Sequence, residues 1–252
     1  MKKFTTENTW EDVWGADGWG SETSDAFGLD QIVRKYLPQG EGQKTFVELG
    51  CAPGSNMAYF HNAMGYEVTG VDYAGIELTS AYLAGQKIPY RLIDCDIFEW
   101  EPEESFDVVF STGLVEHFDP IAPIVDLHKK FVSENGFVVI AIPNLRYFNK
   151  LMVKIVKPEL LEIHNMRIMS PKAFKRHFSG NGFICHYCNY YKTSLLDLDS
   201  NYDYLRERKK LDMLYKALRK ISSGLKLGNI PNRFFSPNIV IIAQRASESK
   251  CE

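Results

Sequence analysis

Short apolar runs of strand length recur along the chain and alternate, for most of its length, with stretches of helical periodicity. This alternation indicates βαβ units, because an apolar run followed by a helical stretch and a second run is typical of two parallel strands joined by a crossover helix. Such units build a parallel sheet with helices on both faces, so the pattern predicts an α/β, doubly wound fold. A helix is expected to start at Ser170-Pro171. The seven runs lie at residues 44–50, 66–71, 89–94, 106–110, 136–142, 183–191 and 237–243.

The composition is that of one globular domain. The 252 residues are 45% hydrophobic and carry a net charge of −3, and a chain of roughly 250 residues can form a single α/β domain. The five cysteines are odd in number and scattered, and no charged-then-apolar leader opens the chain, which favours a reducing, cytoplasmic setting. We expect no integral membrane association and no nucleic-acid partner, since the chain has no long apolar segment and is not basic.

The loop after the first strand carries the clearest chemistry. Read from Gly50, the dinucleotide pattern Gly-x-Gly-x-x-Gly fails at Ala52 and Ser55, which weakens a hydride-transfer enzyme. A phosphate-binding P-loop also fails, because no Gly-Lys-Ser/Thr follows and Pro53 lacks the backbone N–H that a phosphate would use. The acid that precedes the loop, Glu48, instead suits a cationic ligand.

These residues resemble the first motif of the class I S-adenosylmethionine-dependent methyltransferases. That motif is acid-x-Gly-x-Gly-x-Gly, and here it reads ELGCAPG over residues 48–54, with Ala52 in place of the middle glycine. The resemblance implies a Rossmann-like, mostly parallel, seven-stranded sheet and S-adenosylmethionine as cofactor, with S-adenosylhomocysteine as product. It also implies that Glu48 lies near the ammonium group of the cofactor and that the loop backbone approaches its methionine part. The loop residues assigned to the cofactor are Gly50, Cys51, Ala52 and Gly54.

Further motifs follow in the order of the same family. Asp72 ends the second strand, where the resemblance implies hydrogen bonds to the ribose hydroxyls, and Tyr73 is expected to pack on adenine. Asp96 follows the third strand as the acid for the adenine amino group, with Ile97 covering the ring. Thr112, at the end of the fourth strand, completes the predicted cofactor-binding set. For Asp72 and Asp96 the alternative is an ordinary turn aspartate that caps the next helix.

Two histidines are candidates for a catalytic base. The sequence STGLVEHF around His117 resembles the branch of the family that contains ubiquinone O-methyltransferases, and His164 precedes the penultimate helix, where related enzymes often carry a histidine near the acceptor. Imidazole titrates close to neutrality, so either ring could take a proton from a hydroxyl group. Some relatives bind a divalent ion through Glu-x-x-Glu-His. Because Gly113 replaces the first glutamate, we predict no metal.

Three segments outside the alternation are expected to complete the domain around the cofactor-binding core of residues 44–142. The N-terminal residues 1–30 hold three tryptophans (Trp10, Trp14 and Trp19), and we expect them to fold over the cofactor as an aromatic cap, the alternative being a segment packed on the outside. Residues 145–168 and 197–235 read as helical insertions on the acceptor side. In the first, Phe148, Leu151, Met152 and Ile155 share one helical face. The second contains a basic amphipathic helix over 204–222, which packs on the domain or contacts an anionic acceptor, a membrane surface or a second subunit.

The segment Cys185-His186-Tyr187-Cys188 invites a metal or redox interpretation. Regular strand geometry sends side chains three residues apart to opposite faces of a sheet, so the sequence predicts ordinary sheet residues here.

The predicted partner is a small polar acceptor, favoured as anionic because basic and aromatic residues concentrate in both insertions. We expect an O-methyltransferase acting on a sugar or secondary metabolite, with an N-methyltransferase of an amino sugar or amine as the nearest alternative. A homodimer through a helical insertion, a nicotinamide-dependent oxidoreductase and a non-catalytic cofactor-binding subunit remain further alternatives.

Overall fold

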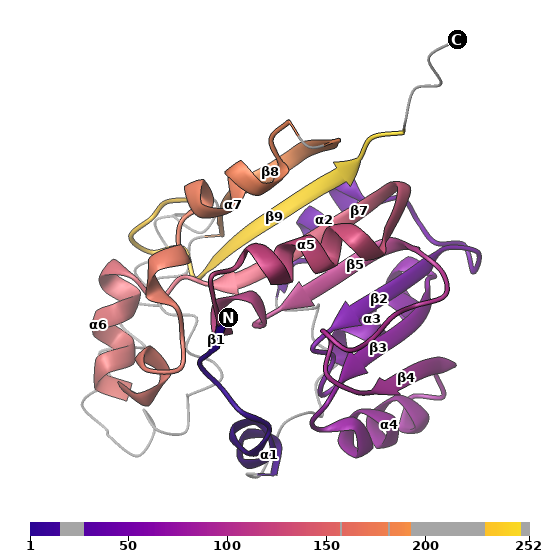
Figure 1. The fold of residues 1–252 in the computed structure, drawn as a ribbon, viewed down its shortest axis with the longest axis horizontal. Helices are drawn as coiled ribbons and strands as arrows, with labels where there is room; N and C mark the ends of the chain where they lie inside the picture. Colours follow the sequence, from indigo (N-terminus) through magenta and orange to yellow (C-terminus); the bar gives the residue numbers. More distant parts are fainter. Residues whose placement is uncertain (16–27, 157, 181, 193–229, 248–252) are drawn as a thin grey trace.

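A seven-stranded sheet forms the centre of the computed structural model, which describes residues 1–15, 28–156, 158–180, 182–192 and 230–247 (Figure 1). Its strand order is β4-β3-β2-β5-β7-β9-β8, and β9 is antiparallel to both of its neighbours while the other pairs in the sheet are parallel. The predicted doubly wound α/β fold with a mostly parallel sheet is confirmed. The strands are β2 Thr45–Leu49, β3 Glu67–Asp72, β4 Tyr90–Asp94, β5 Phe106–Thr112, β7 Val132–Pro143, β8 Phe183–Tyr191 and β9 Asn238–Arg245.

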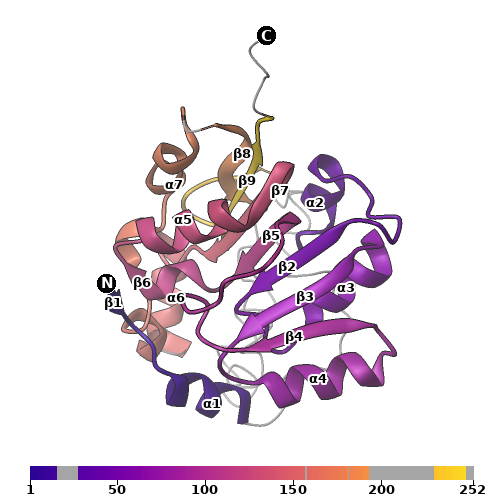
Figure 2. The same ribbon diagram turned by 45° about the vertical axis from the view of Figure 1, so that its right-hand side comes forward.

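Helices cover both faces of the sheet, as Figure 2 shows. On one face α5 and α7 pack over a core cluster that includes Val47, and on the other α2, α3 and α4 pack over a second cluster that includes Phe46. Adjacent residues of β2 therefore serve opposite cores, which is why this strand is apolar nearly throughout. The helices are α2 Asp30–Tyr36, α3 Ser55–Met64, α4 Ile76–Gly85, α5 Ala122–Phe131 and α7 Pro171–Phe178. The last begins where the sequence predicted, with Ser170 as its N-cap.

The strands after β2 are added on opposite sides of it: β3 and β4 lie on one side, and β5 and β7 lie on the other. In a doubly wound sheet this is the point where loops from neighbouring strands diverge and leave a crevice at the carboxyl ends of the strands. The residues that follow β2, β3, β4 and β5 are therefore brought to one edge.

The N-terminal segment lies at this same edge. The short strand β1 (Lys2–Lys3) pairs antiparallel with β6 (Phe118–Asp119), and the Phe4 backbone N–H donates to the His117 carbonyl at 2.9 Å. Helix α1 (Glu7–Gly15) follows directly and lies below the sheet in both views (Figures 1 and 2). Of the three predicted cap tryptophans, Trp19 and the side chain of Trp14 lie outside the described residues.

The first insertion is helical as predicted, but its predicted apolar face is only partly buried. It contains α6 (Tyr147–Val156) and the 3₁₀ helices η3 (Pro158–Leu161) and η4 (Met166–Ile168). Phe148 packs against Phe235, and Val153 is buried, whereas Leu151 is 55% and Ile155 37% exposed. Because α6 has apolar residues on more than one side, periodicity alone did not identify the packed stripe.

The second insertion falls mostly outside the described residues, and so does the whole predicted helix 204–222. The homodimer expected through an insertion therefore stays a prediction. Among the helices that the structure describes, none is both long enough and apolar enough to cross a membrane.

Candidate functional site

The loop between β2 and α3 is a tight turn that requires glycine at two positions. Gly50 and Gly54 have φ of 73° and 94°, in the left-handed region where a side chain is strained. A Cβ on Gly50 would also lie 3.1 Å from the Leu114 side chain. Between them, Cys51 is buried with its thiol in the core, and burial raises the pKa of that thiol. Of the predicted residue Cys51, the backbone alone can therefore face a ligand.

A buried carboxylate lies beneath this loop. Oε1 of Glu48 accepts a hydrogen bond from Nδ2 of Asn56 at 2.6 Å, and the same amide group donates to Oγ1 of Thr112 at 3.2 Å. Glu48 Oε2 and Asn56 Oδ1 are buried without a hydrogen-bond partner. Burial raises the pKa of Glu48 well above its ordinary value. Both unpartnered oxygens are acceptors, so they would suit a cation with several N–H donors, such as an ammonium group.

Asn56 is a residue that sequence reasoning missed. It occupies the first turn of α3 and is almost fully buried, together with the apolar residues Met57 and Ala58 that follow it. A polar residue on the buried face of a helix was the available signal, but its partners come from β2 and β5, so its role needs the assembled sheet.

Asp72 holds the loop in place. Its Oδ2 accepts from the Ala52 N–H at 3.1 Å, and its Oδ1 accepts from the Tyr73 and Ala74 N–H groups at 2.9 and 3.2 Å. Burial raises its pKa, and these N–H groups oppose the rise. Asp72 does not cap α4, whose N-cap is Gly75. A carboxylate oxygen has two lone pairs, so acceptor capacity remains for ligand hydroxyl groups.

Asp96 lies close to the N-terminal segment. Its Oδ1 accepts from the Phe98 N–H at 3.0 Å, and its Oδ2 forms an ion pair with Nζ of Lys3 at 2.5 Å. The Lys3 ammonium also lies 5.9 Å from the Tyr73 ring centroid and 5.7 Å from that of Phe98. Ile97 is buried in the core. Phe98 is therefore the residue of this turn that faces the Lys3 ammonium group. Nothing in the motif spacing pointed to Lys3.

Both candidate histidines lie in one buried cluster with Glu116. The 3₁₀ helix η2 (Val115–His117) follows β5 and carries Glu116 and His117, and the segment after α6 supplies His164. The His117 and His164 ring centroids are 4.7 Å apart, and Nε2 of His164 lies 3.9 Å from Oε1 of Glu116. Trp10 meets His117 edge-on at 5.0 Å. Both carboxyl oxygens of Glu116 are buried without a hydrogen-bond partner.

Burial shifts the pKa of each of the three side chains in this cluster in the direction that favours its neutral form. It raises the pKa of Glu116 to about 8 and lowers that of His117 to about 4, with His164 adding to the second shift. Burial also lowers the pKa of His164. Near neutral pH the cluster therefore holds neutral imidazoles beside an acid that is close to titrating.

The two histidines differ in what their nitrogens contact. Nδ1 of His117 lies 2.7 Å from the Ile163 carbonyl, and its ring meets Trp10 edge-on. Nδ1 of His164 lies 2.5 Å from the Leu160 carbonyl, which leaves Nε2 on the side of the buried carboxyl group. His164 therefore has Nε2 beside a carboxyl group and available for proton transfer, whereas His117 packs against Trp10.

The raised pKa of Glu116 predicts a pH dependence of stability. A group protonated more tightly in the folded chain contributes stability that is full below its ordinary pKa of 4.5 and is lost as the pH rises through about 8. The loss is about 1.4 kcal/mol per pH unit within that window. Urea unfolding at several pH values should show that the free energy of unfolding of Glu116→Gln increases relative to that of the wild type between pH 4.5 and about 8. A constant difference between the two proteins would contradict the assigned pKa.

Glu116, His117 and His164 also offer three ligand atoms within 4.8 Å of one another. The prediction of no metal rested on Gly113, and the spacing of the motif did not reveal that His164 joins the group. Nδ1 of each histidine faces a backbone carbonyl, so Nε2 of the two rings and the Glu116 carboxyl group are the atoms that could hold an ion. The absence of a metal stays a prediction.

We expect extensive dialysis against a chelator to leave the predicted methyl-transfer activity within about twofold, because Gly113 stands where the metal-binding relatives carry the first glutamate of their motif. The measurement is methyl transfer before and after dialysis, with the metal content determined on the same samples. A loss that added Mg²⁺ or Zn²⁺ restores would overturn this expectation.

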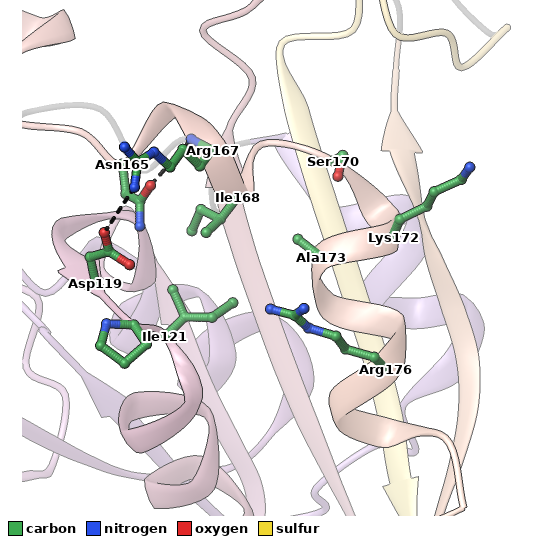
Figure 3. Close-up of a pocket in the computed structure, with 10 residues that line it drawn as sticks. Asp119, Ile121, Asn165, Arg167, Ile168, Ser170, Lys172, Ala173 and Arg176 are labelled. Carbon is green, nitrogen blue, oxygen red and sulfur yellow. Dashed lines mark hydrogen bonds and ion pairs between the residues drawn. The ribbon is translucent and has the colours of Figure 1, made fainter.

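A basic pocket opens beside this cluster, between the start of α5 and α7 (Figure 3). It has a volume of about 440 Å³, and Arg167, Lys172 and Arg176 line it. Arg167 lies 3.8 Å from Asp119 through one guanidinium nitrogen. The pocket shares Asn165 with the wall of the cluster, since the Asn165 N–H donates to the Glu116 carbonyl at 2.7 Å.

Comparison with known proteins identifies the family. A family model described as "Methyltransferase domain" matches residues 25–187. Ubiquinone biosynthesis O-methyltransferase of Hydrogenovibrio crunogenus is 27% identical over 157 residues, which cover 59% of this chain and 65% of the relative. The enzyme of that name from Rhodopseudomonas palustris is 24% identical over 149 residues, or 55% and 57% of the two chains. The chain thus spans less than two thirds of the length of these relatives.

Solved structures share the fold at low sequence identity. Geranyl diphosphate C-methyltransferase from Streptomyces coelicolor A3(2), crystallised with Mg²⁺, geranyl diphosphate and S-adenosylhomocysteine, has a TM-score of 0.59 at 13% identity, covering 95% of this chain and 98% of that one. The plantazolicin methyltransferase BpumL in complex with S-adenosylhomocysteine has a TM-score of 0.54 at 13% identity, covering 95% of both chains. With a family model matching more than half of its length, the chain belongs to the methyltransferase domain family.

Proposed function

We propose that the protein transfers the methyl group of S-adenosylmethionine to a hydroxyl group of a small polar acceptor, a sugar or another secondary metabolite. The observation that carries this proposal is the buried, unpartnered carboxyl group of Glu116, 3.9 Å from Nε2 of His164. A hydroxyl acceptor needs a base, because its lone pair is weakly nucleophilic until the proton leaves. Both matched relatives are named as O-methyltransferases, which supports an oxygen acceptor.

The predicted cofactor residues fit the parts of S-adenosylmethionine, which when bound supplies an electrophilic methyl group. Glu48 Oε2 and Asn56 Oδ1 would accept hydrogen bonds from its ammonium group. Asp72 would accept from the ribose hydroxyls. Asp96 would accept from the adenine amino group once its ion pair with Lys3 opens.

The proton of the acceptor would move to Nε2 of His164. Leu160 holds the opposite nitrogen of the ring, so the orientation of Nε2 is set by the backbone. The imidazolium formed in this way would gain a counter-charge when Glu116 is ionised, because the two groups are 3.9 Å apart in a buried place. Positioning of the acceptor in line with the methyl group contributes on the order of 7–11 kcal/mol in such reactions, and the base adds to this.

The N-terminal segment would act as the cap of this site. Lys3 meets Asp96 and Trp10 meets His117, so residues of the segment contact both the cofactor side and the acceptor side. We propose that residues 1–30 close over bound cofactor and that the insertions at 145–168 and 197–235 complete the acceptor side of the single domain.

An acidic group on the acceptor would fit the basic pocket. Lys172 and Arg176 line it together with Arg167, and Asn165 connects the pocket to the Glu116 cluster. We expect the Arg176→Gln variant to raise the KM of an anionic acceptor about tenfold, since one charge-assisted hydrogen bond is worth roughly 1.5–3 kcal/mol, and to leave kcat nearly unchanged. Lys175→Gln, on the same helix but outside the pocket lining, is the matched control. Equal KM values in both variants would exclude the pocket from acceptor binding.

A screen for S-adenosylhomocysteine release tests the proposed function. The purified protein is incubated with S-adenosylmethionine and with sugars, nucleotide sugars, phenols or amines, and methylated products are identified by mass spectrometry. Turnover with hydroxyl compounds is the expected result. Turnover restricted to amines would make the protein an N-methyltransferase. A thermal shift with NAD but none with S-adenosylhomocysteine would indicate the oxidoreductase alternative, and cofactor binding without turnover would favour a non-catalytic subunit.

A further inference from the structure

The two cysteines of the Cys185-His186-Tyr187-Cys188 segment lie on the same face of β8, contrary to the prediction from strand geometry. Cys185 pairs with Ala243 of β9, and Tyr187 pairs with the next residue, Ile242. His186 is therefore an extra residue in this strand, a β-bulge. The extra residue shifts by one position the alternation of side chains between the two faces of the sheet. Side chains three positions apart on either side of the bulge therefore lie on the same face.

Side-chain contacts support this arrangement. The rings of His186 and Tyr187 both lie near Tyr36 of α2, with centroids 6.1 and 6.2 Å away, so these adjacent residues share a face. Cys188 instead packs against the core cluster beneath α5 and α7. Sγ of Cys185 donates to the Tyr187 carbonyl at 3.6 Å, and both Cys188 and Lys175 of α7 influence the pKa of the Cys185 thiol.

The two thiols have different environments. The hydrogen bond from Cys188, with the nearby charge of Lys175 contributing, lowers the pKa of Cys185 to about 7. The same hydrogen bond and burial raise the pKa of Cys188, whose Sγ also donates to the Pro171 carbonyl at 3.2 Å. Cys185 is thus the more acidic thiol of the pair, and Cys188 keeps its proton.

We propose that Cys185 and Cys188 form a redox-active dithiol, which a hydroperoxide oxidises to an intramolecular disulfide. The pair shares no residue with the methyl-transfer site, so this reactivity is separate from the proposed function. In the described part of the sheet β8 is an edge strand, hydrogen-bonded to β9 alone. An edge strand with a bulge can adjust its backbone to bring two sulfur atoms into bonding distance at less cost than a central strand.

The reaction balances with hydrogen peroxide as the oxidant. The Cys185 thiolate attacks one peroxide oxygen, the O–O bond breaks, and hydroxide leaves, which converts Cys185 to a sulfenic acid. The sulfur of Cys188 then attacks the sulfur of Cys185, its proton combines with the departing hydroxide, and water leaves as the S–S bond forms. In total, two thiols lose two electrons and two protons to one peroxide, which becomes two waters.

The test uses the full chain treated with a small excess of hydrogen peroxide, followed by alkylation of the remaining thiols and peptide mass spectrometry. The expected product is a peptide that has lost two hydrogen atoms, with Cys185 and Cys188 both protected from alkylation and both released by a phosphine reductant. Cys51 and Cys95 provide internal references in the same digest. Recovery of Cys185 as sulfinic acid with Cys188 still alkylated, or of both as free thiols, would overturn the proposal.

Single variants separate the roles of the two sulfurs. Cys188→Ser should stop at a sulfenic acid on Cys185 that dimedone traps, whereas Cys185→Ser should give neither the sulfenic acid nor the disulfide. Lys175→Gln should slow the reaction with peroxide about fivefold near pH 7, because the thiolate fraction falls, and Lys175→Arg should restore it. Trapping on Cys188 in the Cys185→Ser variant, or equal rates in both Lys175 variants, would contradict the assigned order of attack.

Discussion

The His164→Gln variant is expected to lose about a hundredfold or more in kcat with a hydroxyl acceptor, because a positioned general base contributes roughly 10²–10⁴-fold. Glutamine keeps a polar group of similar reach but cannot take up the proton. The loss should appear at saturating S-adenosylmethionine and acceptor, while the Kd of the cofactor stays within about twofold. Initial rates of S-adenosylhomocysteine release and a binding titration measure the two quantities.

His117→Gln is the matched control, since both histidines belong to one cluster. His117 is 3% exposed and held by the Ile163 carbonyl, so this variant should lose stability and keep kcat within about tenfold of the wild type. A larger loss in His117→Gln than in His164→Gln, with both proteins folded, would reverse the assignment. Losses below about tenfold in both would leave positioning as the source of catalysis.

Glu116 sets the expected pH profile of the same reaction. Its carboxyl pKa is about 8, so the counter-charge beside His164 appears as the pH rises through that value. We therefore expect kcat/KM of the wild type to rise up to about pH 8 and the rise to be absent in Glu116→Gln. An identical rise in the variant would assign the titration to another group.

The Glu48→Gln variant is expected to bind S-adenosylmethionine about 10- to 100-fold more weakly, because a hydrogen bond to a charged group is worth roughly 1.5–3 kcal/mol. The same variant should unfold at a higher temperature without ligand. In the free protein Oε2 of Glu48 is buried without a partner, and a neutral amide avoids the cost of desolvating that carboxylate. Calorimetric titration and thermal unfolding of the same samples check both effects.

The pKa of Glu48 makes cofactor binding depend on pH. Since burial raises that pKa well above 4.5, the stability contributed by the protonated form is full below that value and is lost as the pH rises toward the raised pKa. An ammonium ligand favours the ionised form, so wild-type affinity should increase with pH and that of Glu48→Gln should not. Glu67→Gln, at the exposed start of β3, is the control. Equal affinities in Glu48→Gln and wild type would place the ammonium group elsewhere.

Much of the fold followed from the sequence because its signals are local. Each predicted strand was found within a few residues, since an apolar run between turn residues has few alternatives in a chain of this composition. The glycine loop was predicted for the same reason, as Gly50 and Gly54 occupy backbone conformations that suit glycine. The apolar face predicted for α6 is only partly buried, since Leu151 and Ile155 are exposed.

The contacts across the site were beyond sequence reasoning because they join distant parts of the chain. Asn56 bridges Glu48 and Thr112, Lys3 reaches Asp96, and the pairing of Glu116 with His164 depends on where the segment after α6 returns to the sheet. The hydrophobic periodicity of the sequence contains no information about these distances. The bulge at His186 is a further case, because one unpaired residue reverses the predicted faces of everything that follows it in the strand.

The sequence by itself determined the positions of the strands along the chain, the glycine loop and the family, since each depends on neighbouring residues and their backbone preferences. The tertiary structure alone decided which histidine faces Glu116, which carboxyl oxygens stay unpartnered and which cysteines share a face. Those properties depend on burial and on contacts between remote segments, and packing sets both only when the whole chain has folded.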